Sequence, residues 1–321
     1  MSNRRKFLLP LAIVAVLLIA MFPTGPYAAS LISWMAIGAL MASSMRFVLL
    51  FGELNFAVAA FVGIGAYTAG MATTEYQIVF PLAILLAGLA AAFVSFFFGF
   101  ITLKVKGPYF KLIGFAFAEV VRICYSQSDT LGGNSGIIGV FPPLALDPWM
   151  TFFVVSFAVV ILLGLYAVER SDFGKLLLAI KENDDVVRTV GINVHWIKIL
   201  CFVLASFVAG LAGSLQAFVN NVISPADFGF MLSVFALAYL KVGGEDSPLG
   251  PVAGSIVLVG LGSIALTFGA GEHIFYGAAI ALAVLFFPKG MIGFAKDTVG
   301  KWRDRGATNT TAVAATQKGE A

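Results

Sequence analysis

Ionisable side chains within apolar stretches are the groups of this chain best placed to do chemistry. Five of them stand out: Arg46, Glu53, Glu119, Arg122 and Lys241. A charge at the centre of a membrane helix costs about 2.5–3.5 kcal/mol, so each needs a physical reason to be there. Arg46 and Glu53 lie near the ends of apolar stretches, where long side chains can reach lipid headgroups.

Glu119 and Arg122 are three residues apart, which places them on one helical face where they can pair. The pair is either the charged centre of an ion-coupled transporter or a clasp that reduces the cost of burying both charges. We favour the clasp, because no further group in the chain forms a proton relay with the pair. An ion-coupled secondary transporter built on Glu119 and Arg122 is the main alternative function.

The residue types of enzyme active sites are scarce. The two histidines, His195 and His273, fall on opposite sides of the membrane in the topology derived below, and no nucleophile–base cluster accompanies them. Cys124 and Cys201 both lie inside apolar stretches, which argues against a disulfide framework or a metal site. No nucleotide-binding motif is present. We therefore expect no catalytic residue, no metal and no cofactor on this chain. An integral membrane enzyme is a less favoured function than an ion-coupled transporter.

Residues 169–193 form a polar segment with the pattern of short amphipathic helices. Ser171 can cap a helix whose apolar residues follow at i, i+3, i+4 and i+7: Phe173, Leu176, Leu177 and Ile180. Asn183 can cap a second short helix, which Gly191 is placed to end. Such a helix lies on the membrane surface or inserts into a groove of another protein. The residues by themselves leave both possibilities open.

Closely spaced glycines mark the segment 127–148, where Gly132, Gly133 and Gly136 alternate with small polar residues. Exposed backbone amides in such a loop can approach a ligand or a docking surface, and an ordinary turn explains the composition equally well. The loop does not bind a nucleotide phosphate, because the Gly-Lys-Ser/Thr element is missing.

Apolar stretches must position all of these groups. A spanning helix needs about 20 apolar residues, and we expect ten spans, at 7–22, 29–50, 54–73, 78–103, 109–126, 149–168, 196–220, 227–242, 251–270 and 273–287. Hydrophobic residues make up 60% of the chain and charged residues 12%, against about 25% charged in soluble domains. The predicted fold is an all-α polytopic membrane protein with about ten transmembrane helices and a cytoplasmic amphipathic helix.

Positive charge is confined to one side of this arrangement. None of the twenty Lys and Arg residues lies in the five connections that the span count places outside, at 23–28, 74–77, 127–148, 221–226 and 271–272. Cationic loops are retained in the cytoplasm during insertion. We therefore expect a multi-pass protein of the cell (inner) membrane with both termini cytoplasmic. The basic residues form no clustered face with stacking aromatics, so no nucleic acid is expected as a partner.

The predicted domain organisation has three parts. Residues 1–28 form the cytoplasmic N-terminus and the first span, 29–294 the transmembrane domain with its loop 169–193, and 295–321 a cytoplasmic, disordered tail poor in large apolar groups. The basic start of the first part, its short apolar run and the Ala28–Ala29 pair also resemble a cleavable signal peptide. The sequence leaves open whether the first span is retained.

Several motifs, taken together, resemble the LivM-type permeases of ABC importers for branched-chain amino acids. The run Ser171-Asp-Phe-Gly174-Lys175-Leu-Leu-Leu-Ala179-Ile180-Lys181-Glu182, followed by Gly191, looks like the motif with which these permeases contact their ATPases. Four further stretches agree, and they are Gly52–Phe61 with Gly63 to Tyr67, Lys106–Phe110, Gly132–Ile137, and the last third from Gly243-Gly244 through Leu249-Gly250-Pro251 to Phe287-Pro288-Lys289-Gly290. The resemblance covers roughly residues 29–294, in the family's own order.

This resemblance implies partners. It implies a second homologous permease subunit, two cytoplasmic ABC ATPase subunits that receive the 171–191 helix in a groove, and a periplasmic or surface solute-binding protein, all around a chain embedded in membrane lipid. ATP hydrolysis would belong to the ATPases. The expected path residues are Glu53, Asn55, Phe61 and Tyr67 on the third span, with Glu119 and Arg122.

Departures from the family pattern bear on the solute. Where relatives usually carry Gly-Gln-x-Ser-x-Gly-His, this chain has Glu53, Asn55, Ala57 and Val58. Relatives import branched-chain amino acids, other amino acids, urea and amides, so the sequence alone does not name the solute.

Overall fold

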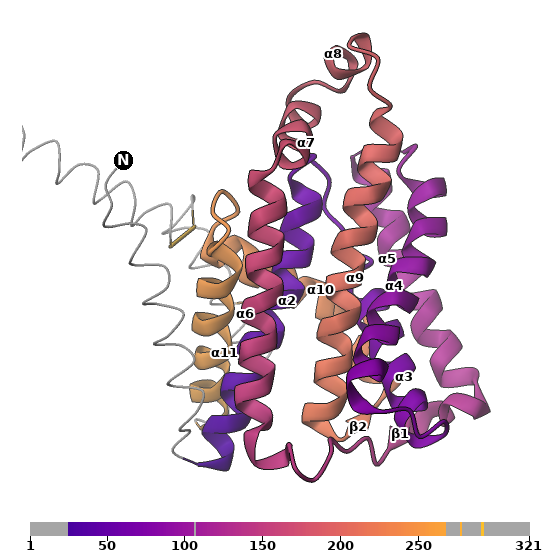
Figure 1. Cartoon of the computed structure of the whole chain (residues 1–321), viewed down its shortest axis with the longest axis vertical. Coiled ribbons are helices and arrows are strands. Elements are labelled where there is room, and N and C mark those ends of the chain that lie inside the picture. Colours follow the sequence, from indigo (N-terminus) through magenta and orange to yellow (C-terminus); the bar gives the residue numbers. More distant parts are fainter. Residues whose placement is uncertain (1–24, 106, 268–276, 278–289, 292–321) are drawn as a thin grey trace, which may run out of the picture.

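Long helices run side by side in the computed structural model, which describes residues 25–105, 107–267, 277, 290 and 291 (Figure 1). The helices of the bundle are α2 (Pro26–Leu49), α3 (Val58–Thr74), α4 (Phe80–Thr102), α5 (Pro108–Gln127), α6 (Met150–Arg170), α9 (Val194–Asn220), α10 (Phe230–Gly243) and α11 (Gly250–Thr267). The expected span 7–22, the span 273–287 apart from residue 277, and the tail 295–321 lie outside the described residues.

The two ends of the bundle differ. At one end lie the short helices α7 (Asp172–Glu182) and α8 (Asp184–Thr189), and at the other the strands β1 (Ile137–Ile138) and β2 (Val222–Ile223) form a small antiparallel ribbon (Figure 1). Four short 3-10 helices complete the described part: η1 (Asp129–Leu131), η2 (Gly133–Ser135), η3 (Asp147–Trp149) and η4 (Pro225–Phe228).

Within the described residues, four helical stretches are long and apolar enough to cross a membrane: α2, α4, Asp147–Arg170 and α9. The helices α3, α10 and α11 are apolar but shorter. Two expected spans begin later than their hydropathy indicates, because local capping interactions delay the helix. The Asn55 Oδ1 atom accepts a hydrogen bond from the Ala57 backbone amide at 2.9 Å before α3 begins, and Ser224 and Asp227 form a capping box around η4 before α10.

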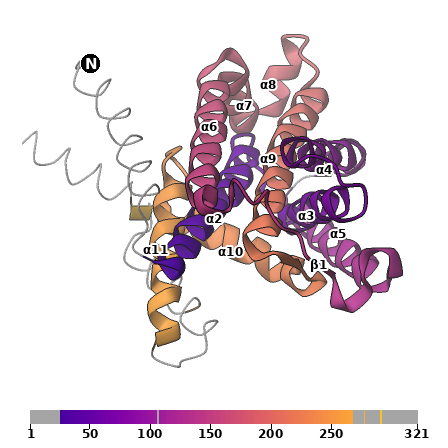
Figure 2. The same cartoon turned by 60° about the horizontal axis from the view of Figure 1, so that its bottom comes forward.

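The helix α9 lies at the centre of the packing, in contact with α2, α3 and α4 (Figure 2). Glycines allow the closest of these approaches. A Cβ atom on Gly65 of α3 would overlap the Gly210 carbonyl of α9, and one on Gly213 would overlap the Val62 carbonyl. Helices in lipid gain no hydrophobic drive to associate, so close backbone contact through small residues is what holds them together.

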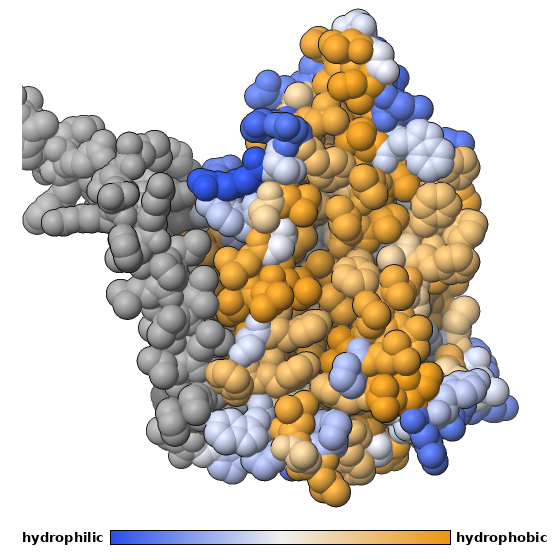
Figure 3. All heavy atoms as spheres, viewed as in Figure 1, coloured by the Kyte–Doolittle hydropathy of each residue, from blue (hydrophilic) through white to orange (hydrophobic). Residues whose placement is uncertain are grey.

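The outer surface of the bundle is apolar over its middle. Figure 3 shows a broad hydrophobic region across the visible face, with hydrophilic residues concentrated toward the ends. Large apolar side chains that are exposed include Phe93, Phe97, Ile101, Leu112 and Val160. A soluble monomer rarely exposes apolar patches of this extent, whereas a hydrocarbon environment accommodates them.

The glycine contacts between α3 and α9 predict a stability difference. Gly65→Ala should lower the unfolding free energy by about 1–3 kcal/mol, the usual cost of overpacking a close contact. Gly164→Ala on α6 is the matched control, because a Cβ atom there meets nothing within 4 Å and alanine favours a helix over glycine by about 1 kcal/mol. Thermal melting in detergent measures the stability of each purified variant. Equal melting temperatures for Gly65→Ala and Gly164→Ala would show that the contact at Gly65 does not contribute to stability.

Candidate functional site

The segment formed by α7 and α8 has the amphipathic structure expected from its sequence. Leu177 and Ile180 are buried, and Phe173 and Leu176 pack against the same core, which confirms the predicted apolar stripe. Lys175, Ala179, Lys181 and Glu182 are exposed on the other side. Leu178, Val186 and Val190 are exposed as well. The segment therefore presents a surface of mixed charged and apolar residues away from the bundle.

The ends of these two helices are formed partly as expected. The Asn183 Oδ1 atom accepts from the backbone amides of Asp185 and Val186, and Gly191 follows α8 with a φ of +83°, so both roles are confirmed. Ser171 occupies the N-cap position of α7, but its hydroxyl donates to the Val168 carbonyl at 2.6 Å and does not cap the helix. The predicted side-chain cap at Ser171 is therefore wrong.

A tight bend joins α6 to α7. A Cβ atom on Gly174 would overlap the carbonyl of Glu169 in the last turn of α6, so only glycine fits this position without a shift of the backbone. The stem of Lys181 lies against Gly52, whose φ is +96°, in the turn that follows α2. The segment thus rests directly on the ends of two bundle helices.

A buried ion pair fixes the end of α6, from which α7 departs. The Arg46 guanidinium of α2 contacts both carboxylate oxygens of Glu169 at 2.7 and 2.8 Å, and its Nε donates to the Glu245 carbonyl at 2.9 Å. The Arg46 side chain is only 7% exposed. The expectation that Arg46 reaches the lipid headgroups is wrong, because the residue is committed to a bidentate contact that joins three parts of the chain.

A second buried pair holds α8. The Lys198 Nζ atom of α9 lies 2.9 Å from an Asp184 carboxylate oxygen, with the two side chains 7% and 9% exposed. Asp184 also lies in the first turn of α8, at the positive end of the helix dipole. Lys198 was not among the residues expected from the sequence to form a site. The two residues are fourteen positions apart on different helices, so no local spacing marks them as partners.

Glu53 and Asn55 hold backbone at the junctions of α3 and α5. Both carboxylate oxygens of Glu53 accept from the Gly107 amide, at 3.0 and 3.2 Å, and Glu53 is buried. Asn55 caps the chain before α3 through the Ala57 amide. Glu53 therefore does not extend to headgroups, and its observed role is to fix the start of α5.

Glu119 and Arg122 form the predicted pair, with Arg122 Nε 2.8 Å from Glu119 Oε2. The other Glu119 oxygen accepts from the Phe230 amide at 3.1 Å. The pair therefore ties α5 to the first residue of α10, and this geometry favours the structural clasp over a transport element.

The remaining expected path residues pack in the interior. Phe61 lies among the rings of Phe98, Phe117 and Phe202, and Tyr67 stacks on Tyr125 with ring centroids 4.2 Å apart. None of the six expected path residues lines the cavity between α2, α10 and α11 that is described below, and their place on a path stays a prediction.

The glycine loop adopts tight turns against the ribbon. Gly132, Gly133 and Gly136 have φ values of +79°, +52° and +71°, and a Cβ atom on Gly136 would overlap the Ile223 carbonyl of β2. Glycine is thus required for turn geometry at Gly136. Whether the loop also docks a ligand or a protein stays a prediction.

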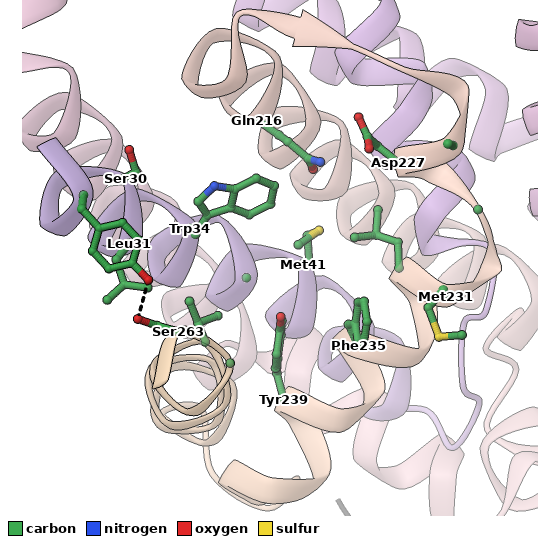
Figure 4. A pocket seen from close by; sticks show the side chains of 17 residues that line it. Ser30, Leu31, Trp34, Met41, Gln216, Asp227, Met231, Phe235, Tyr239 and Ser263 are labelled. Carbon is green, nitrogen blue, oxygen red and sulfur yellow. Dashed lines mark hydrogen bonds between the residues drawn. The ribbon is translucent and has the colours of Figure 1, made fainter. Parts of the chain in front are cut away.

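A cavity of about 570 Å³ opens between α2, η4, α10, α11 and the end of α9 near the ribbon (Figure 4). Its walls are mainly apolar and aromatic, and they include Leu31, Trp34, Met41, Phe235 and Tyr239. Its lining also includes polar residues, and these are Gln216, Asp227, Tyr27, Ser30 and Ser263. Sequence analysis did not find this cavity, because each element contributes only a few residues, from positions 27 to 263.

Similar proteins identify the chain at the level of its family. A family described as the permease component of branched-chain amino acid transport systems matches residues 27–287. The chain is 26% identical over 271 residues to the high-affinity branched-chain amino acid transport permease LivM of Escherichia coli K12, an alignment that covers 75% of this chain and 64% of that protein. The chain thus spans less than two thirds of the length of that relative.

Sugar permeases are also similar. The L-arabinose ABC transporter permease AraH of Azospirillum brasilense is 30% identical over 271 residues, with 76% of this chain and 75% of that protein covered. The ribose import permease RbsC of Escherichia coli K12 is 24% identical over 241 residues, with 70% and 72% covered. No solved structure matches the chain. Because the family match extends over nearly all of the described bundle, this multi-pass membrane protein belongs to the permease components of branched-chain amino acid transport systems.

Proposed function

We propose that this chain is a transmembrane subunit of an ABC importer that moves branched-chain amino acids or a related small polar solute into the cytoplasm. One observation carries the proposal. The α7–α8 segment projects from one end of the bundle (Figure 1). One buried ion pair, Lys198–Asp184, holds α8 on α9, and another, Arg46–Glu169, holds the end of α6 from which α7 departs. A segment that only lay on a membrane surface would not need such anchors.

The anchored segment suits the transmission of force from an ATPase. Its exposed residues are available to a partner, while its buried stripe and the Lys198–Asp184 pair fasten it to α6 and α9. ATP binding favours one arrangement of an ATPase dimer, and a docked helix carries that preference to the bundle as a two-state bias. ATP hydrolysis then takes place on the partner subunits and not on this chain.

The remaining partners follow from the same proposal. A second, homologous permease would complete the translocation path, and a periplasmic or surface solute-binding protein would deliver the solute at the ribbon end. The one-sided distribution of Lys and Arg residues supports a cytoplasmic position for α7, α8 and both termini.

The rival function, an ion-coupled transporter, rests on Glu119 and Arg122. Each of these groups already has a partner in the described structure, and Glu119 is engaged on both oxygens. Uptake that collapsed with an uncoupler but survived loss of the ATPase partners would favour this rival.

Exchanging the charges of Lys181 and Glu182 should disrupt coupling without disturbing the fold. Both side chains are exposed, and the double variant Lys181→Glu/Glu182→Lys keeps the net charge of the segment. We expect solute uptake to fall by about 5- to 150-fold, the range of typical coupling free energies, with unchanged membrane insertion.

Gly174→Pro should abolish uptake, because no side chain fits beside the Glu169 carbonyl.

The control for the charge exchange is Glu75→Gln, an exposed carboxylate that directly follows α3 toward the opposite end of the bundle. Its uptake should equal that of the unmodified protein. Normal uptake by the exchanged variant would show that α7 is not the coupling element.

Breaking the Lys198–Asp184 pair should separate stability from coupling. Lys198→Met removes the ion-pair partner of the buried Asp184 carboxylate and should cost about 3–5 kcal/mol of unfolding free energy, whereas Lys198→Met/Asp184→Leu removes both charges and should recover most of it. We expect uptake to stay low in the double variant, because the ion pair between α8 and α9 is lost. Detergent melting and vesicle uptake measure the two effects, and full uptake by a stable double variant would rule out this pair as part of the coupling path.

A further inference from the structure

The cavity between α2, α9, α10 and α11 contains a polar group that the described structure leaves unsatisfied. Gln216 of α9 is 3% exposed, and its Oε1 atom has no hydrogen-bond partner. The side chain points into the cavity beside Trp34 (Figure 4). A buried acceptor without a partner is unfavourable, so this position calls for a donor supplied from the cavity itself.

A carboxylate lies on the same side of the cavity. Asp227 belongs to η4, and one of its oxygens accepts from the Ser224 amide at 3.4 Å as part of the capping box. No Lys or Arg residue of the described structure forms an ion pair with Asp227. Burial raises the pKa of its carboxyl group. Arg122, the nearby cation, is engaged by Glu119.

The described lining therefore has one sign of charge. It includes a carboxylate and an unsatisfied amide oxygen, and no Lys, Arg or His residue. The opposite side is formed by aromatic rings such as Phe235 and Tyr239, with aliphatic walls at Leu31 and Met41 (Figure 4). Aromatic faces attract cations, while the aliphatic walls suit a compact apolar group.

We propose that this cavity is a solute site for a primary ammonium group carried on a small apolar body, with Asp227 and Gln216 as acceptors for the ammonium hydrogens. A cavity of about 570 Å³ lies within the range of small-ligand sites, about 300–1,000 Å³. The inference rests on the proposed import function and adds that this chain itself recognises the solute.

The negative charge of Asp227 distinguishes an amine from a sugar at this site. The hydroxyl-bearing residues of the lining, Tyr27, Ser30, Tyr239 and Ser263, suit either kind of solute, and Tyr27 and Ser263 hydrogen-bond to each other at 2.7 Å. A carboxylate forms a charge-assisted hydrogen bond with an ammonium group and not with a neutral pentose. The similarity to sugar permeases therefore does not decide the solute of this chain.

A cysteine placed at the cavity tests the proposal locally. Ser30 lines the cavity and is exposed, so Ser30→Cys in a Cys124→Ser background provides one accessible thiol, because Cys201 is buried. The rate of maleimide labelling is measured on washed membranes that contain the full chain with its partners. The probes are leucine, 3-methylbutylamine, N-acetylleucine and ribose.

Leucine and 3-methylbutylamine should slow labelling about tenfold at ten times their dissociation constants, since the free site decreases with ligand occupancy. N-acetylleucine lacks the ammonium group, and ribose lacks both the ammonium and the apolar body, so neither should protect. Equal protection by N-acetylleucine, or no protection by either amine, would overturn the proposal.

Two variants assign the effect to the acceptors. Asp227→Asn keeps an acceptor for the Ser224 amide but loses the charge, and Gln216→Met keeps the size of the side chain. Each should weaken protection by leucine about tenfold or more, as expected for loss of a charge-assisted hydrogen bond. Asp147→Asn is the matched control, because Asp147 also lies in the first turn of a 3-10 helix but outside the cavity. Unchanged protection in Asp227→Asn and Gln216→Met would contradict the assignment.

Failure of this inference and failure of the proposed function give different results. Protection of the thiol introduced by Ser30→Cys needs no ATP. If leucine protects this thiol but the chain moves no solute with ATPase partners, the solute site is supported and the import function is contradicted. If uptake depends on Lys181 and Glu182 but no probe protects the introduced thiol, the import function is supported and the solute site is contradicted.

Discussion

The contact between Arg46 and Glu169 is the constraint on which the α7–α8 end of the structure depends. A buried guanidinium is tolerable only when it is paired and hydrogen-bonded, and here each of its three nitrogens donates a hydrogen bond, two to the Glu169 carboxylate and one to the Glu245 carbonyl. These acceptors come from the end of α6 and from the turn after α10. The helix α2, the end of α6 and that turn must therefore meet at one point, which fixes where the α7–α8 segment leaves the bundle.

Local patterns predicted the parts of this arrangement that depend on neighbouring residues. The apolar stripe of α7, the Asn183 cap and the turn at Gly191 follow from spacing and from backbone preferences, as does the Glu119–Arg122 pair at i and i+3. The Arg46–Glu169 contact joins residues 123 positions apart, so no periodicity indicates it. The starts of α3 and α10 were misplaced because hydropathy does not register the competition from the side chains of Asn55 and Asp227.

The cavity escaped sequence analysis for a related physical reason. Gln216 sits in a long apolar helix, where a single amide resembles an ordinary interior residue, and Asp227 resembles a turn former. Their proximity arises only when α9 and η4 fold back past α2. Their combined character, an unsatisfied acceptor beside a carboxylate that has no ion pair among the described residues, is a property of the tertiary structure and not of either segment.

Helix α9 links the two functional regions. It carries Lys198, which holds α8, and Gln216, which faces the cavity, and the 18 residues between them correspond to roughly 27 Å of helix at about 1.5 Å per residue. Between these positions, Gly213 brings the backbone of α9 against the backbone of α3, and Gly210 brings it against Ala87, Gly88 and Ala91 of α4. Packing this close does not absorb small displacements by deforming. A shift of α8 would therefore move α9 together with its neighbours, so a partner that biases α7 and α8 would also bias the position of the Gln216 acceptor.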